Sequence, residues 1–153
     1  MRSIEEYISG FTDGEGSFMI CFSPRSKMLV GWEVRPSFSA SQNGDRAEVL
    51  YLMQEYFGCG TIRPNRKDRT LKYEVRSLND LLMKVIPHFN KYPLLSSKKK
   101  GFEIFADVCE RMRGGAHLTL HGLKKITRLV QQMEFSHSRK YHFNEIGAVE
   151  MKI

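Results

Sequence analysis

The sequence predicts an α+β domain in which helices back one face of a four-stranded antiparallel sheet. Three observations favour this class. Two pairs of segments alternate apolar and polar residues with the period of a strand, several longer segments repeat apolar residues with the period of a helix, and these segments follow the order α-β-β-α-β-β-α. The chain has 153 residues, of which 41% are hydrophobic, so we expect one domain over residues 1–153, with an irregular tail over 134–153.

The first element is a helix that begins near residue 4. Ser3 and Glu6 have the S-x-x-E spacing of a capping box, and apolar residues follow at helical spacing. We expect this apolar stripe to anchor the helix in its own core; it comprises Ile4, Tyr7, Ile8 and Phe11. The opposite face is small or polar, which would let a second copy of the helix approach closely; it comprises Ser9, Gly10 and Asp13.

Two glycines end this helix beside an acid. Gly14 and Gly16 leave Glu15 at the C-terminal end, just before an extended segment. A carboxylate there faces the negative end of the helix dipole, which is unfavourable unless a cation lies beside it. Glu15 is therefore a candidate metal ligand. The alternative is that Asp13 and Glu15 are an ordinary pair of surface acids.

Two hairpins with an intervening helix come next. Residues 17–23 and 32–41 alternate as strands, and a helix capped by Asn43 is expected to run to about Phe57. Thr61 to about Asn65 and Thr70 to Arg76 form the second pair of strands. Each strand places apolar residues on one face and polar residues on the other.

Three more helices complete the pattern. Ser77 caps the first, which Tyr92-Pro93 stops. The second is expected from Lys98 to Arg113, where two glycines end it, and the last from about Thr119 to Met133. With these helices on its apolar face, the sheet exposes a polar face that no other element covers.

The charge and the polar strand faces point to nucleic acid. Lys and Arg exceed Asp and Glu by 24 − 17 = +7, and no apolar run of about 18 residues indicates a membrane span. Mixed Arg, Lys, Glu, Asn and Ser side chains on strands suit the reading of base edges. The alternative is a solvated face without a ligand. The candidate DNA-binding residues are Met19, Cys21, Ser23, Arg25, Lys27, Glu33, Arg35, Ser37, Ser39, Thr61, Arg63, Asn65, Arg66, Lys67, Arg69, Lys72, Glu74 and Arg76.

Three consecutive lysines begin at Lys98, at the expected start of a helix. Cations at that end oppose the helix dipole, so local helix stability does not explain them. Hydrolysis of a phosphodiester with bound Mg²⁺ needs a carboxylate on the metal and a cation near the developing charge. Glu15 and Lys98 are candidates for these two roles. The alternative for the lysines is a solvated turn.

Residues 7–16 resemble the signature of the LAGLIDADG homing endonucleases. They read YISGFTDGEG, with Ile8-Ser9 in place of the family's Leu-Ala and a Glu in place of its last Asp. The resemblance continues in a strand that ends at Ser41-Gln42, in Arg46 of the next helix, and in the segment YPLLSSKK at residues 92–99. The order of helices and strands is also that of the family.

The resemblance implies roles for individual residues. Glu15 would be the metal-binding acid, with the Gly14 carbonyl as an additional ligand, and Gln42 would help orient the attacking water. Arg46 and Lys98 would be the basic residues near the scissile phosphate. The implied metal is Mg²⁺, with Mn²⁺ or Ca²⁺ as substitutes for binding.

The resemblance also implies an assembly and an activity. With one motif in the chain, the protein would be a homodimer joined by its motif helices. It would cut double-stranded DNA at a long pseudopalindromic site, leave short 3′ overhangs and promote intron mobility, in an organelle or a microbial cytoplasm. The alternatives are an intron RNA maturase, with intron RNA as the partner, and a cleavage-inactive DNA-binding protein of the same fold.

Overall fold

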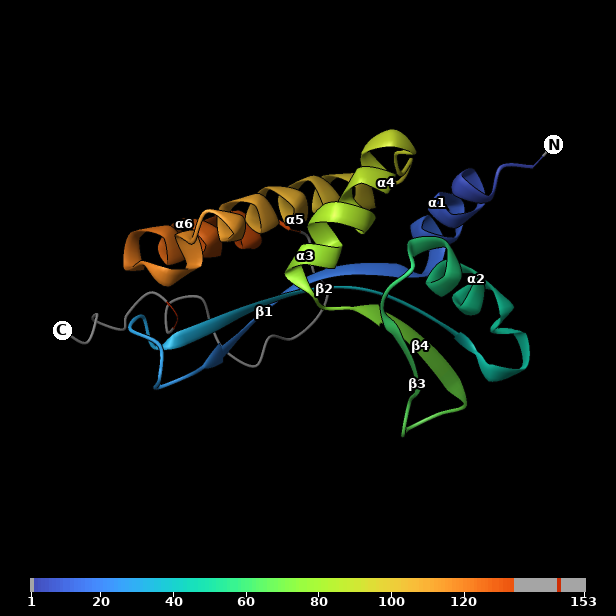
Figure 1. Cartoon of the computed structure of the whole chain (residues 1–153), viewed down its shortest axis with the longest axis horizontal. Helices are drawn as coiled ribbons and strands as arrows, with labels where there is room; N and C mark the ends of the chain where they lie inside the picture. Colours follow the sequence, from blue (N-terminus) through green and yellow to red (C-terminus); the bar gives the residue numbers. More distant parts are fainter. Residues whose placement is uncertain (1, 134–145, 147–153) are drawn as a thin grey trace. The chain divides into compact units, whose positions relative to one another are not determined.

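The computed structural model describes residues 2–133 and residue 146, and it confirms the α+β class (Figure 1). The expected irregular tail lies outside the described residues, apart from residue 146. Within the described part, no helix combines the length and the apolar character needed to cross a membrane. The elements are α1 (Ile4–Glu15), β1 (Gly16–Pro24), β2 (Trp32–Asn43), η1 (Gly44–Arg46), α2 (Glu48–Phe57), β3 (Thr61–Pro64), β4 (Thr70–Val75), α3 (Leu78–Asp80), η2 (Leu81–Val85), α4 (Ile86–Lys91), α5 (Lys98–Arg113), η3 (Ala116–Leu118) and α6 (Leu120–Gln131).

The four strands form one sheet in the order β1-β2-β4-β3. Strand β2 pairs antiparallel with β4, with Ser39 opposite Glu74, and β3 pairs antiparallel with β4, with Arg63 opposite Lys72. Burial alternates along β1 from Gly16, as the period of two in the sequence predicted. The sheet and its two hairpins are therefore confirmed.

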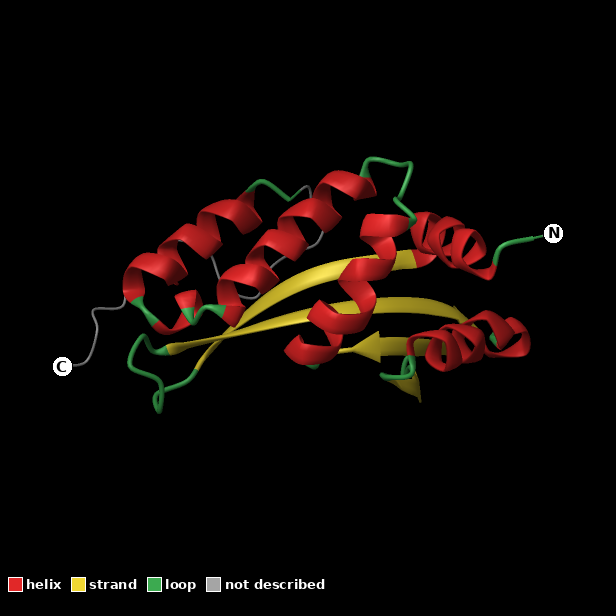
Figure 2. Ribbon diagram, turned by 45° about the horizontal axis from the view of Figure 1, so that its top comes forward, coloured by secondary structure: helices red, strands yellow, loops and turns green. Residues whose placement is uncertain are grey.

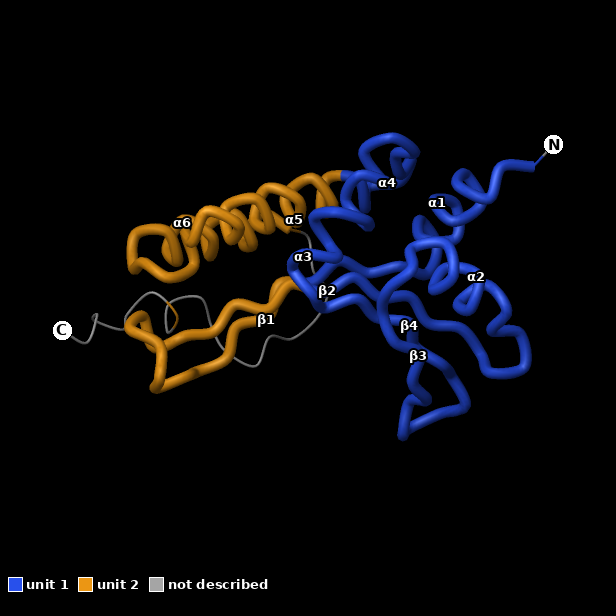
Figure 3. The backbone as a smooth tube through the Cα atoms, in the orientation of Figure 1, with its two compact units in different colours: residues 1–19, 37–99 blue, residues 20–36, 100–153 orange. Residues whose placement is uncertain are grey.

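The chain divides into two compact units, which Figure 3 draws in blue and orange. The first unit comprises residues 1–19 and 37–99. Its helices α1, α2 and α4 lie on one side of the strands (Figure 2), and its core contains a cluster of aromatic rings. Phe38 stacks on Phe18 with 5.1 Å between ring centroids and meets Phe89 at 5.5 Å. All of the candidate catalytic residues belong to this unit.

The second unit comprises residues 20–36 and 100–153. In its described part, α5 and α6 run side by side and bury apolar residues that include Phe105, Leu123 and Ile126. Gly115 has a positive φ of 80°, which lets the chain turn between the two helices without strain. The Thr119 side chain accepts a hydrogen bond from the Gly122 N–H and caps α6.

Two helices differ from their predicted form. Asn43 makes no capping bond; a 3₁₀ turn precedes α2, which begins at Glu48. The helix after Ser77 contains the π-helical turn η2 between α3 and α4. Pro87 follows this turn and has no backbone N–H. It therefore cannot donate the hydrogen bond to a carbonyl of the preceding turn, and the regular series of α-helical hydrogen bonds is interrupted there. The Ser77 cap itself is confirmed by its bond from the Asp80 N–H.

The buried face of α1 is rotated from the predicted one. Ile8 is buried as expected, but Ile4 and Tyr7 are 49% and 54% exposed, so the prediction that they anchor the helix in its own core is wrong. Ser9 and Thr12 are buried instead. Ser9 therefore directs its hydroxyl to its own chain, and its assignment to the face that meets a second copy stays a prediction. A serine tolerates this burial because its hydroxyl finds hydrogen-bond partners inside the unit.

Candidate functional site

Glu15 is the last residue of α1, and its side chain is exposed to solvent. The turn that follows is tight: a Cβ at Gly16 would lie 2.5 Å from Thr12 Cγ2 and 2.8 Å from Thr12 O, so only glycine fits there. Gly14 has open space around it. Among residues 2–133 and 146, no three His, Cys, Asp or Glu side chains gather into a metal-binding cluster.

Lys98 closes the C-terminal end of α1. Its Nζ donates hydrogen bonds to Thr12 O at 3.0 Å and to Gly16 O at 2.6 Å, although it lies more than 80 residues away in the sequence. Burial lowers the pKa of Lys98, while the nearby charges of Asp13 and Glu15 oppose this shift. The structure thus brings together Glu15 and Lys98, the two residues expected to carry the chemistry.

Asp13 ties the same helix end to the start of α5. Its carboxylate accepts hydrogen bonds from Leu95 N at 2.8 Å, Ser96 N at 3.2 Å and Ser96 Oγ at 2.6 Å. Partial burial raises the pKa of Asp13, but the bonds from Ser96 and Leu95 outweigh it, and the pKa lies below its ordinary value. These contacts order the end of α1 by holding it against the residues that precede α5.

Gln42 and Arg46 lie at the end of β2 and in η1. The Gln42 Oε1 accepts a hydrogen bond from Asn43 N, and Arg46 Nε lies 3.9 Å from Asp45 Oδ1. Within the described part of the chain, no hydrogen bond or ion pair links either side chain to Glu15 or Lys98. Their proposed roles near the scissile phosphate stay predictions.

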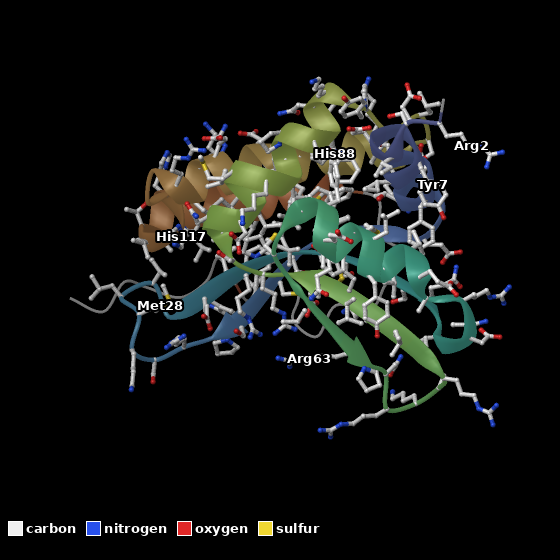
Figure 4. All side chains as sticks on the ribbon, turned by 45° about the vertical axis from the view of Figure 1, so that its right-hand side comes forward. Arg2, Tyr7, Met28, Arg63, His88 and His117 are labelled. Atoms are coloured by element: carbon white, nitrogen blue, oxygen red, sulfur yellow. The ribbon has the colours of Figure 1, made fainter. Side chains whose placement is uncertain are left out.

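The predicted DNA-binding residues are exposed or half-buried, with one exception. Ser39 is only 6% exposed and lies opposite the longer Glu74 on the neighbouring strand, so we remove it from the candidate contacts. Arg63 on β3 extends into solvent (Figure 4). At the tip of the β3–β4 hairpin, Asn65 accepts a hydrogen bond from Lys67 N, which shapes the turn.

Ion pairs organise the cations of this face within each unit. In the first unit, Glu74 lies 3.1 Å from Lys72 and 2.8 Å from Arg76. In the second, Arg25 lies 2.9 Å from Glu33. Each pair holds long side chains in defined positions, but mutual neutralisation weakens their attraction for phosphate.

Sequence reasoning did not predict the hydrogen bonds around Ser9. Ser9 Oγ lies 3.0 Å from His88 Nε2, and His88 Nδ1 lies 2.9 Å from the Tyr56 hydroxyl. These residues come from α1, α4 and α2, so no local pattern predicts their contact. The available signal was the serine that replaces the family's alanine in the motif.

Comparisons with known proteins bear on the family and the fold of the chain. The sequence profile described as LAGLIDADG endonuclease matches residues 8–109. "Probable intron-encoded endonuclease 2" of Neurospora crassa is 34% identical over 121 residues, 78% of this chain and 27% of the relative. The chain spans about a quarter of the length of this and a second Neurospora relative.

Two solved structures resemble nearly the whole chain. The homing endonuclease I-TnaI has a TM-score of 0.84 and 32% sequence identity, and 95% of each chain is covered. The archaeal intron-encoded homing endonuclease I-Vdi141I, solved in complex with DNA, has a TM-score of 0.86 and 31% identity and covers 95% of this chain and 92% of its own. The family profile, the relatives and the fold agree, and the chain belongs to the LAGLIDADG endonuclease family.

Proposed function

We propose that this chain is one subunit of a metal-dependent endonuclease that cuts double-stranded DNA at a specific site. The observation that carries the proposal is the contact between Lys98 and the end of α1, which places a cation beside the exposed Glu15. The polar strands supply a surface suited to DNA. I-Vdi141I, which shares the fold over most of its length, was solved with DNA bound.

The residues at the end of α1 fit a hard divalent cation such as Mg²⁺. The Glu15 carboxylate is exposed and has no hydrogen bond or ion pair within the described part of the chain, and Gly14 contributes a carbonyl oxygen beside it. Oxygen ligands of this kind suit Mg²⁺, which would supply Lewis-acid activation of the phosphate and of the attacking water. Lys98 would stabilise the negative charge that develops on the phosphate.

The proposal includes a second copy of the chain. Ile4 and Tyr7 expose apolar surface on α1, and Gly10 on the same helix leaves room for a neighbouring backbone. A groove of about 360 Å³ runs between this helix and residues 91–95, where Leu95 is 93% exposed. A twofold arrangement would bring two Glu15 carboxylates together, and cations between them would relieve their repulsion.

Several finer expectations belong to the same proposal. Short 3′ overhangs and a pseudopalindromic target are expected from a twofold enzyme with its two cuts across the minor groove. Promotion of intron mobility fits the intron-encoded relatives, and a DNA-containing organelle or microbial cytoplasm fits the activity. A role with intron RNA stays a prediction.

Cleavage of the host's intron-free allele tests the proposed function. The wild type should linearise this DNA with Mg²⁺ and bind it without cutting in Ca²⁺. Glu15→Gln should bind equally well but not cut, whereas the matched control Glu55→Gln, an exposed acid on α2, should cut like the wild type. Binding by the wild type without cleavage in Mg²⁺ or Mn²⁺ would refute the nuclease proposal. Normal cleavage by Glu15→Gln would refute its role as the metal ligand.

A further inference from the structure

The motif helix carries a buried serine where the family signature has alanine. Ser9 is 6% exposed, and its Oγ donates a hydrogen bond to Tyr92 O at 2.7 Å. Its second neighbour is His88 Nε2 at 3.0 Å. A buried hydroxyl is costly unless it is satisfied, so its two partners on a distant segment need an explanation.

The neighbouring atoms fix the direction of every hydrogen bond in this cluster. The Tyr92 carbonyl can only accept, so it takes the single proton of Ser9. His88 must then donate from Nε2 to Ser9 Oγ, and its bare Nδ1 accepts from the Tyr56 hydroxyl at 2.9 Å. The result is a row of hydrogen bonds that all donate in the same direction, from Tyr56 to His88, from His88 to Ser9 and from Ser9 to Tyr92 O, so each of these polar groups has a partner.

The surroundings of His88 hold it in this neutral form. Its side chain is 5% exposed, and its ring packs edge-to-face against Tyr56, Phe57 and Phe89 with centroids 5.2, 5.4 and 4.6 Å away. Burial lowers the pKa of His88 to about 4, although the charge of Glu5 opposes the shift. The imidazole is therefore neutral and singly protonated near neutral pH. Figure 4 shows His88 on α4, on the side of the unit that holds α1.

The hydrogen bonds of Ser9 hold a part of α1 that the other hydrogen bonds of this helix do not reach. Asp13 and the carbonyls of Thr12 and Gly16 fasten only the C-terminal end of the helix, through Ser96 and Lys98. Ser9 lies four residues before Asp13, which places it about 6 Å closer to the N-terminus along the helix axis. Together with the packing of the buried Ile8, this second point of attachment restricts how far α1 can pivot or rotate about its C-terminal end.

We infer that the hydrogen bonds from His88 to Ser9 and from Ser9 to Tyr92 O form a positioning device that fixes the orientation of α1 and thereby aims Glu15, while the Tyr56 hydroxyl sets the tautomer of His88. None of its members touches the proposed metal or phosphate; they act through the helix. The inference rests on the proposed function for its effect on the reaction. Displacement by about 1 Å can slow catalysis on the order of 100-fold, so a small rotation of α1 should be measurable.

Two substitutions of His88 separate this role from simple loss of packing. In His88→Gln the amide can occupy the place of Nε2 and still donate to Ser9, whereas in His88→Asn the amide reaches only the place of Nδ1 and loses Ser9. We expect Ser9→Ala and His88→Asn to lower the single-turnover cleavage rate by about tenfold or more, with the Kd for DNA changed less than about twofold. His88→Gln and Tyr56→Phe should stay within about threefold of the wild type because they keep the bond to Ser9. All rates are measured well below the lowest Tm of the set.

Hydrogen exchange of the α1 amides gives a readout that does not depend on cleavage. Exchange should accelerate between Ile8 and Thr12 in Ser9→Ala and His88→Asn, but not in His88→Gln, with the amides of α5 unchanged. Equal rates of cleavage and exchange in Ser9→Ala and the wild type would overturn the inference, as would equal losses in His88→Gln and His88→Asn. If the wild type does not cleave but the exchange pattern holds, the proposed function fails and the anchoring of α1 stands.

Discussion

Replacing Gly16 by alanine tests the close contact at the end of α1. The new Cβ would lie 2.5 Å from Thr12 Cγ2 and 2.8 Å from Thr12 O. The φ of Gly16 is −82°, which any residue can adopt, so the cost is steric rather than conformational. Thr12 O cannot retreat without opening the last turn of the helix. We therefore expect a loss of about 1–3 kcal/mol in the free energy of unfolding, the range for forcing a methyl group into a packed site.

Gly14→Ala is the matched control, two residues earlier on the same helix. No atom lies within 4 Å of a Cβ added there, and its φ is not positive. Alanine also keeps the carbonyl that is proposed as a metal ligand. Because alanine loses less backbone freedom than glycine on forming a helix, we expect a gain of up to about 1 kcal/mol. The two substitutions should thus change stability in opposite directions.

Urea unfolding of both variants measures the difference. A shift in the midpoint with an unchanged slope reports stability directly, and each kcal/mol corresponds to about 2–4 °C in Tm for a domain of this size. Cleavage should also fall in Gly16→Ala because Gly16 O is the closer acceptor of Lys98. If Gly16→Ala unfolds at the same urea concentration as Gly14→Ala, the steric argument is wrong.

Three further predictions concern the exposed face of α1, the buried His88 and the polar face of the sheet. Gly10→Leu should leave the fold intact but convert the proposed dimer to monomers in analytical ultracentrifugation. The control Gly101→Leu on α5, where an added side chain also meets open space, should stay dimeric. A dimeric Gly10→Leu would exclude the exposed face of α1 as the dimer interface. Burial lowers the pKa of His88 from 6.5 to about 4, so the unfolded chain takes up the proton first as pH falls. Stability should drop between those pH values by up to about 3 kcal/mol, and His88→Gln should flatten this part of the urea-midpoint profile against pH. Arg63→Ala should cost about 1–3 kcal/mol in binding at particular base pairs if it reads them. An equal loss on every DNA sequence would show that Arg63 contacts phosphate only.

The strands and most helix bounds could be predicted because local patterns determine them. Helix α5 has the expected bounds, Lys98 to Arg113, with two glycines after it, and α2 ends where Gly58 adopts a left-handed conformation. The two helices that differ from their predicted form do so for local reasons that apolar spacing does not reveal. Pro87 removes one N–H from a helix that the apolar spacing alone makes continuous, and Asn43 caps nothing because a 3₁₀ turn intervenes.

The candidate site was predictable only in part because its contacts join distant segments. Glu15 was recognisable from its position between two glycines, but the rotation of α1 was not. Spacing identified an apolar stripe, whereas the buried side is set by Ser9, whose partners lie 79 and 83 residues away. Lys98 likewise reaches Thr12 O over 86 residues. Hydrogen bonds of this range depend on the folded arrangement and leave no periodic signal.

The position of Lys98 changes the argument about the acid at the end of α1. A carboxylate at that end is unfavourable because the last carbonyls of the helix carry partial negative charge. Lys98 neutralises part of that charge by binding Thr12 O, which is one of these carbonyls, and Gly16 O just beyond the helix, so Glu15 is tolerated in a single chain without any metal. The unfavourable placement is therefore not by itself evidence for a cation. What supports a metal is that Lys98 gives its hydrogen bonds to carbonyl oxygens and leaves the Glu15 carboxylate without a direct partner among the described residues. Removing the Lys98 ammonium with Lys98→Met should therefore lower both the stability of the helix end and the cleavage rate. Removing the Glu15 carboxylate with Glu15→Gln should lower only the cleavage rate.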